Sequence, residues 1–183
     1  MPTCPSAIRT SVRIVTELSS SQKGGLAELK IAAEAADLGI DVYRPMIDGA
    51  RCDLIFDNGR RLLRVQCKWA RRNGDVIVIR LRTCRHSATR GYIRTTYSAS
   101  EIDGIAAYCR ELNRSFFLPI REFDGRTHVH LRLAAARNGQ LLGVKMAADY
   151  PLGAVAQLGE RVTGSHEVRG SSPLSSTSAY TPP

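Results

Sequence analysis

Three polar residues whose side chains could take part in catalysis lie in or beside short apolar runs: Asp53, Gln66 and Lys68. Gln66 and Lys68 are two positions apart in the stretch LLRVQCKWARR, so on a β-strand both would lie on one face. A carboxylate such as that of Asp53 can anchor Mg²⁺, a hard ion that takes oxygen ligands. The ion polarises a phosphate and lowers the pKa of a bound water. A neighbouring lysine can position that water or stabilise the transition state. The set therefore suits hydrolysis of a phosphodiester.

A β-hairpin is expected to hold these residues, because Asn58-Gly59 is a strong two-residue turn signal between two apolar runs. Such a turn would pair Asp53 with Arg64 and place Gln66 diagonal to Asp53 on the same face. The apolar residues of the two strands would form the opposite, core-facing side: Leu54, Phe56, Leu63, Val65, Cys67 and Trp69.

The charge of the chain predicts a polyanionic partner. The 183 residues carry a formal net charge of +9, and such an excess favours nucleic acid or an anionic surface. Between Arg60 and Arg94 there are eleven Lys or Arg and one acid, Asp75. A block this one-sided indicates contacts with the phosphates of double-stranded DNA. The expected contact residues are Arg64, Arg71, Arg72, Arg80, Arg82, Arg85, Arg90 and Arg94.

Several classes of protein are disfavoured. The five cysteines form no CxxC pair and no Cys/His cluster, so a structural zinc site is not expected. No secretory signal begins the sequence, so a cytoplasmic location with free thiols is expected. No apolar run is long enough to span a bilayer, so no membrane partner is expected.

Hydrophobic periodicity predicts an α/β (α+β) fold with a mixed central sheet flanked by helices. A helix is expected over 22–38 with Leu26, Leu29, Ala33 and Ala36 on its buried face. Residues 98–113 are expected to form a second, amphipathic helix, and residues 84–97 a basic turn region. Residues 137–150 are expected to be a short helix or irregular. Strands are expected at 41–45, on both sides of Asn58-Gly59, and at 75–83, 115–120 and 127–133.

The domain organisation is expected to be simple. Residues 1–20 are assigned to a flexible segment, 21–150 to one domain and 151–183 to a disordered tail. Within this tail, residues 153–177 can be encoded by triplets that resemble the D-arm and T-arm of a transfer RNA gene. We therefore interpret the tail as read-through into such a gene, which would build no core.

Asp53, a spacer of twelve residues and Gln66-Cys67-Lys68 resemble the PD-(D/E)xK nuclease signature. Over about residues 22–150, segments such as CDLIFDNGRRLLRVQCKWA and EIDGIAAYCRELNRSFFLPI are similar to the group I intron-associated branch of these endonucleases. The resemblance implies a restriction-endonuclease-like fold and cleavage of double-stranded DNA that depends on Mg²⁺ or Mn²⁺. It also implies an acid from the preceding helix, Glu28 or alternatively Glu34.

The resemblance implies catalytic roles for Asp53, Gln66, Lys68 and Glu28, with Asp53, Gln66 and Glu28 as metal ligands. A single such site cuts one strand, so a homodimer or larger symmetric assembly is expected. Gln66 replaces the acid of the wider family, and this leaves a catalytically inactive DNA-binding module as the alternative. An RNA-processing protein is a third interpretation. Asp53 could also be a surface acid paired with Arg64, and Lys68 could be one more phosphate contact.

Overall fold

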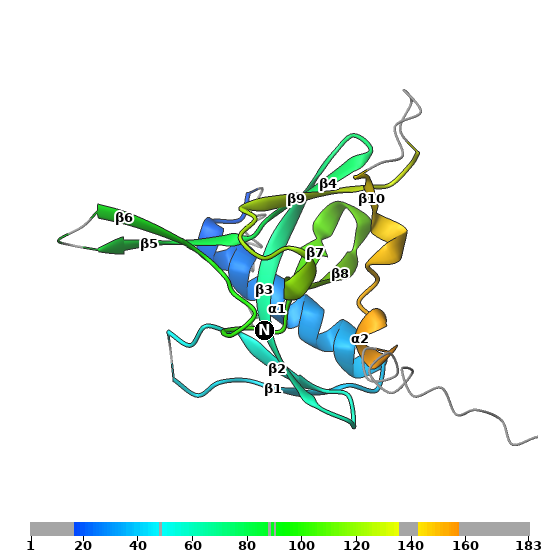
Figure 1. The fold of residues 1–183 in the computed structure, drawn as a ribbon, viewed down its shortest axis with the longest axis horizontal. Coiled ribbons are helices and arrows are strands. Elements are labelled where there is room, and N and C mark those ends of the chain that lie inside the picture. Colours follow the sequence, from blue (N-terminus) through cyan, green and yellow to red (C-terminus); the bar gives the residue numbers. More distant parts are fainter. Residues whose placement is uncertain (1–16, 48, 88, 90, 136–142, 158–183) are drawn as a thin grey trace, which may run out of the picture.

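The computed structural model describes residues 17–157 except positions 48, 88, 90 and 136–142 (Figure 1). The helices in this part of the chain are α1 (Ser20–Asp37), α2 (Ala154–Gln157) and the 3-10 helices η1 (Arg110–Leu112), η2 (Ile120–Glu122) and η3 (Ala147–Asp149). The strands are β1 (Asp41–Tyr43), β2 (Leu54–Asp57), β3 (Leu62–Asn73), β4 (Val76–Arg80), β5 (Arg82–Ser87), β6 (Gly91–Thr96), β7 (Gly104–Cys109), β8 (Arg114–Pro119), β9 (His128–Arg132) and β10 (Lys145–Met146).

Strand β3 organises the fold, because it is twelve residues long and pairs with three other strands. It pairs antiparallel with β2, parallel with β7 and, through its last residues, antiparallel with β4. The described sheet runs β1-β2-β3-β4-β9-β10, and β7 and β8 branch from β3. Strands β5 and β6 form a separate two-stranded ribbon that projects from the body of the molecule (Figure 1). The result is the expected mixed sheet.

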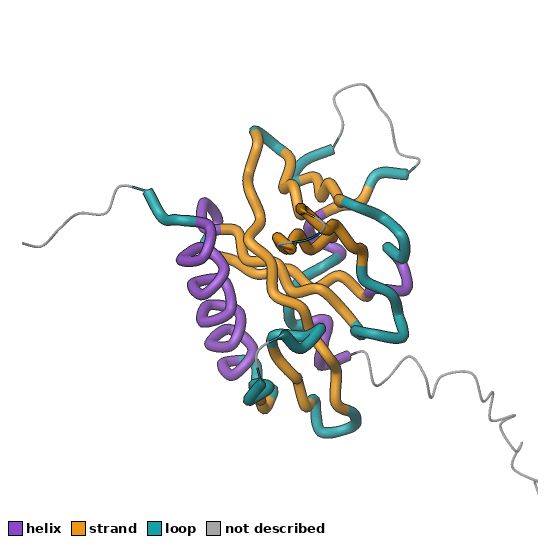
Figure 2. The backbone as a smooth tube through the Cα atoms, turned by 90° about the vertical axis from the view of Figure 1, so that its left-hand side faces the viewer, coloured by secondary structure: helices purple, strands orange, loops and turns teal. Residues whose placement is uncertain are grey.

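Two cores lie on opposite faces of β3. Helix α1 covers one face (Figure 2), where Ala27, Ile31 and Ala35 pack on the apolar side of the β2–β3 hairpin. The other core joins β7 and β8 to β4 and β9; its members include Ile77, Ile79, Ile105, Phe116 and Leu131. Because side chains alternate along β3, the expected core face of the hairpin is confirmed.

Helix α1 starts at a capping box, in which Ser19 Oγ accepts from the Gln22 backbone N–H and the Gln22 side chain accepts from the Ser19 N–H. The expected buried face of this helix is wrong. The buried stripe is Ala27, Ile31 and Ala35, whereas Leu29 is 67% exposed. The expected and the observed sets of residues both follow the helical period, so periodicity alone does not choose between them. The two alanines of the observed set allow the helix to approach the sheet closely.

The helix expected over 98–113 is also wrong, because Gly104–Cys109 is strand β7. All six of its residues are buried between the two cores, so the strand shows no alternation of apolar and polar residues. A Cβ added to Gly104 would lie 2.2 Å from Phe117 Cζ, so only glycine fits at this start of the strand. Residues 84–97 likewise differ from expectation, since most of them belong to β5 and β6.

The hairpin is present, but its register differs from the predicted one. Asp57 pairs with Leu62 and Ile55 with Arg64, so the loop has four residues rather than two. Asn58 Oδ1 accepts hydrogen bonds from the backbone N–H groups of Arg60 and Arg61, which stabilises the longer loop. The shift is two positions, and an even shift keeps every side chain on its predicted face.

The packed chain continues past the expected boundary at residue 150. Leu152 and Val155 are buried in the core beside α1, and the Asn58 side-chain amide donates to the Val155 carbonyl at 3.0 Å. The remainder of the tail, from residue 158, lies outside the described residues. Of the segment expected to be a short helix or irregular, residues 137–142 lie there too, and the rest holds β10 and η3. No helix in the described part of the chain is long and apolar enough to cross a membrane.

Truncation tests this revised boundary. A chain that ends after Tyr150 should lose about 3–6 kcal/mol of unfolding free energy, because two fully buried side chains are removed at about 1.5–3 kcal/mol each. A chain that ends after Gln157 keeps both and serves as the matched control. Urea unfolding of the two proteins measures the difference, and equal stabilities would contradict the assigned packing of Leu152 and Val155.

Candidate active site

Asp53 directly precedes β2 and stands opposite Gln66 on β3. Its backbone N–H donates to the Val65 carbonyl at 2.9 Å, which continues the hairpin pairing by one step. Its Oδ2 accepts from the Cys67 backbone N–H at 2.8 Å and from the Gln66 side-chain amide. The two side chains are therefore in direct contact, which is closer than the diagonal arrangement that the two-residue turn predicted.

Burial raises the pKa of Asp53, and the Cys67 hydrogen bond and the charge of Lys68 only partly oppose this effect. The surrounding protein therefore does not fully offset the cost of burying the negative charge of Asp53. An opposite charge bound within a few ångströms would favour the ionised form. This property fits a carboxylate that receives a cation.

Lys68 is held by Tyr97, which follows β6. The Lys68 ammonium donates to Tyr97 Oη at 2.9 Å and lies 4.9 Å from the centroid of the same ring. Tyr97 itself is only 4% exposed, so its position is set by packing. The ammonium consequently has a defined place beside Gln66 and Asp53.

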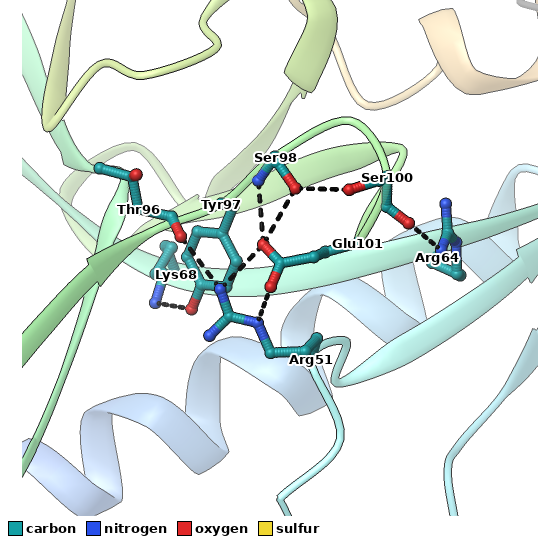
Figure 3. A network of polar contacts seen from close by, with 8 residues as sticks. All are labelled: Arg51, Arg64, Lys68, Thr96, Tyr97, Ser98, Ser100 and Glu101. Atoms are coloured by element: carbon teal, nitrogen blue, oxygen red, sulfur yellow. Dashed lines mark hydrogen bonds and ion pairs between the residues drawn. The ribbon is translucent and has the colours of Figure 1, made fainter.

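Arg51 also contacts the Tyr97 ring, and it forms an ion pair with Glu101 (Figure 3). Arg51 Nε lies 2.9 Å from Glu101 Oε1, and its Nη2 donates at 3.0 Å both to Glu101 Oε2 and to the Thr96 carbonyl. The guanidinium lies 4.7 Å from the centroid of the Tyr97 ring. The hydrogen bond from Arg51 is the main cause that lowers the pKa of Glu101. This network ties the segment before Asp53 to the loop that precedes β7.

An open cavity of about 1000 Å³ brings these residues together. Its lining comprises Gly49, Ala50, Arg51, Asp53, Gln66, Lys68, Thr83, Thr95, Thr96, Tyr97 and Glu101. A smaller cavity of about 160 Å³ adjoins it at Asp53 and contains Glu28 and Arg44. Asp53 thus belongs to both cavities.

Of the two expected helix acids, only Glu28 approaches Asp53. Burial and the negative charge of Asp53 raise the pKa of Glu28, and an ion pair with Arg44 at 2.8 Å opposes this. Glu34 is used elsewhere, since its Oε2 accepts from the Ser115 backbone N–H at 2.9 Å. The geometry therefore favours Glu28 as the partner acid.

The available donors suit a hard divalent ion. Within the described residues no three His, Cys, Asp or Glu side chains gather closely enough to hold a metal. Asp53 and Glu28 offer carboxylate oxygens, and Gln66 offers an amide oxygen once its terminal group is turned. Mg²⁺ needs only a few protein ligands, because it keeps several of its bound water molecules.

The arginines expected to contact DNA occupy different places. Arg64 is bound within the protein, to Asp103 Oδ2 at 3.2 Å and to the Ser100 carbonyl at 2.7 Å. Arg82 is exposed at the start of β5, next to Thr83 of the cavity lining. The others divide into three groups: Arg71, Arg72 and Arg80 line a different groove, Arg85 and Arg94 lie on the β5–β6 ribbon, and Arg90 lies outside the described residues.

Sequence reasoning missed Arg51, Tyr97 and Glu101. Arg51 did carry a signal, since it stands two positions before Asp53, the same spacing that linked Gln66 to Lys68. Tyr97 and Glu101 carried none, because the fold of the β5–β6 ribbon and the following turn brings them to β3.

Comparisons with known proteins give information on the fold. A family model described as PD-(D/E)XK endonuclease matches residues 18–153. The structure of the bacterial homing endonuclease I-Ssp6803I is similar, with 25% sequence identity and a TM-score of 0.64 over 79% of this chain and 97% of that chain. A comparison with curated proteins gives no match. The likeness confirms the restriction-endonuclease-like fold. Nucleases of the matched family generally use divalent metal ions.

The raised pKa values of Asp53 and Glu28 predict proton-linked metal binding. The ordinary pKa values are 3.8 and 4.5, and burial moves both upward. A cation needs both carboxylates charged, so Mg²⁺ affinity should rise with pH above these values and binding should release protons. Calorimetry in buffers of different ionisation enthalpy measures the release. Asp53→Asn should abolish binding and Glu34→Gln should leave it unchanged; binding retained by Asp53→Asn would remove Asp53 as a ligand.

Proposed function

The chain belongs to the PD-(D/E)XK endonuclease family, and we propose that it is a Mg²⁺-dependent endonuclease that hydrolyses phosphodiester bonds of double-stranded DNA. The observation that carries the proposal is the convergence of Asp53, Gln66 and Lys68 on one open cavity. Mn²⁺ is expected to substitute for Mg²⁺, because both accept carboxylate, carbonyl and water oxygens.

Asp53, Gln66 and Glu28 would hold the ion. When bound, it would polarise the scissile phosphate and lower the pKa of a water molecule. Gln66 contributes no charge, but its terminal amide can donate to Asp53 in the free protein and present its oxygen to a cation after rotation. The substitution of an amide for the usual acid is therefore compatible with a ligand role.

Lys68 supplies a positive charge beside Asp53 and Gln66 in the same cavity. Its ammonium has donors beyond the one bound to Tyr97, and these can reach a water molecule or a phosphate oxygen. Arg51 lines the same cavity, with its guanidinium held by Glu101 and Thr96. Preorganised cations of this kind stabilise the charge that develops on the phosphate during hydrolysis.

The finer features of the proposal follow from the resemblance and from symmetry. Cutting both strands of a duplex requires two such sites, so we propose a homodimer or a larger symmetric assembly. A cytoplasmic location is a separate part of the proposal. The similarity to a homing endonuclease supports a role in a mobile element, with a group I intron as the proposed context. The transfer RNA interpretation of the tail stays a proposal.

A catalytically inactive DNA-binding module is the second candidate. Gln66 in place of an acid favours it, as does the lack of a three-ligand acidic cluster among the described residues. Nicking of supercoiled plasmid in Mg²⁺ distinguishes the two functions, since only the endonuclease converts the plasmid to the open circle.

Lys68 provides the sharpest test of catalysis. Lys68→Ala should reduce the rate of plasmid nicking by about 100-fold or more, in the range of a lost catalytic side chain. Equilibrium binding of uncleaved duplex should change little, because other cations contact the backbone. Lys30→Ala, an exposed lysine of α1, is the control for loss of one charge. A fall in binding that matches the fall in rate would make Lys68 a docking residue.

Tyr97 is expected to position Lys68. Tyr97→Phe retains the ring and removes only the hydroxyl that accepts from the ammonium, a bond to a charged group worth about 1.5–3 kcal/mol. The cleavage rate at saturating DNA should fall about tenfold or more, because the ammonium loses the bond that fixes its place, whereas equilibrium binding of uncleaved duplex should change little. Tyr43→Phe, on exposed β1, is the matched control. An unchanged cleavage rate would assign Tyr97 to packing alone.

A further inference from the structure

A second open groove, of about 620 Å³, lies where the first turn of α1 meets β3 and β4. We call it the Trp69 groove, and it is lined by Ser20, Lys23, Trp69, Arg71, Arg72, Asn73, Val78 and Arg80. We propose that this groove binds the phosphate backbone of duplex DNA at a place separate from the active-site cavity, an inference that rests on the proposed function and extends it.

Strand geometry separates the two sites. Gln66 and Lys68 project from one face of β3, and Trp69 and Arg71 project from the opposite face, the one that α1 covers. The pairing of Arg71 with Val78 extends this face onto β4. The described lining of the active-site cavity shares no residue with that of the Trp69 groove.

The same alternation holds on β4 and turns Arg80 toward the groove. Ile77 and Ile79 are buried in the core on the other side of the sheet, so Val78 and Arg80 point away from that core. Arg80 is exposed and joins Arg71 in the groove lining. Two neighbouring strands therefore carry their cations on one surface.

The charge of the groove is complementary to a polyanion. Four of its eight lining residues are cationic, and among the described residues that line it none is acidic. Within the described contacts the side chains of Lys23, Arg71 and Arg80 make no ion pair, so their charges are not neutralised by a neighbour. The first turn of α1 also belongs to the lining, and the positive end of the helix dipole adds to the attraction.

The contacts of Trp69 favour backbone binding over base stacking. Its indole lies 5.8 Å from the Tyr108 ring at 76° and packs against the core under α1. The ring is thus engaged by the protein, and it lines the groove together with the cations. Duplex DNA presents a dense row of phosphates to such a surface, whereas single strands are usually held by free aromatic faces.

A duplex bound over Gln66 and Lys68 would lie on the face of β3 opposite to the Trp69 groove. The phosphates in the Trp69 groove therefore belong to other base pairs, either DNA that flanks the cleaved site or a second DNA molecule. Both sources present the phosphate backbone of a duplex. The nuclease would therefore bind DNA at two surfaces, one on each face of β3.

Trp69 is the single tryptophan of the chain and lines the groove, so all tryptophan fluorescence comes from this site. The experiment titrates duplex DNA into Lys68→Ala protein without metal, where the DNA stays intact. A saturable change in Trp69 emission is expected. Arg71→Gln combined with Arg80→Gln should weaken this transition by about tenfold or more and lower the salt slope by about two units, close to one per phosphate contact. Arg121→Gln combined with Arg126→Gln, at two exposed sites outside the groove, is the matched control.

The length of the DNA separates the two sources. If flanking DNA binds, the midpoint should fall by about tenfold when the duplex is lengthened from one helical turn, about 10 base pairs, to about four turns. If a second molecule binds, the midpoint per site should be the same for both lengths. Either result supports the groove.

Three results would overturn the inference: no change in Trp69 emission, an equal loss in the control variant, or tighter binding of single strands than of duplex. Plasmid cleavage by the wild-type protein without a Trp69 response would refute the groove and leave the nuclease. A Trp69 response in a protein that never cleaves would support the groove and refute the endonuclease.

Discussion

The pairing of Asp53 with β3 is the interaction on which the rest of the candidate site depends. Its backbone N–H donates to Val65, and its carboxylate accepts from the N–H of Cys67, so both main chain and side chain are bound to one strand. A slip of one residue would turn Asp53 toward α1 and separate it from Gln66 and Lys68. The apolar side of the hairpin, buried under α1, resists such a slip because it would expose Phe56 and Leu63.

The electrostatics of the site are incomplete without a ligand. Burial raises the pKa values of Asp53 and Glu28, and their two negative charges repel each other. Lys68 and Arg51 line the same cavity as Asp53, and each lies near the Tyr97 ring. Acids and cations that lie close together in this way suit a metal cation and a phosphate that bind together. Buried charges of this kind destabilise a fold, and the two large cores around β3 offset that cost.

The length of β3 lets one strand serve two surfaces. Its middle carries Gln66 and Lys68 into the active-site cavity, and its last residues pair with β4 and carry arginines to the opposite side. Alternation along a single strand therefore puts the candidate site on one face and a basic groove on the other. The two surfaces cannot shift relative to each other without breaking the central sheet, so DNA bound at both would meet a rigid frame.

Features that depend on short-range periodicity are predictable from the order of residues in the chain. Alternation in the hairpin was enough to place Asp53, Gln66 and Lys68 on one face, even though the turn type and register were predicted wrongly, because the error was an even number of residues. Tertiary structure alone decided the rest. Strand Gly104–Cys109 is covered on both faces, so its sequence lacks the alternation that marks a strand, and the pattern favours a helix instead. The choice of Glu28 over Glu34 and the placement of Tyr97 beside Lys68 depend on contacts between segments far apart in the chain, which no local pattern records.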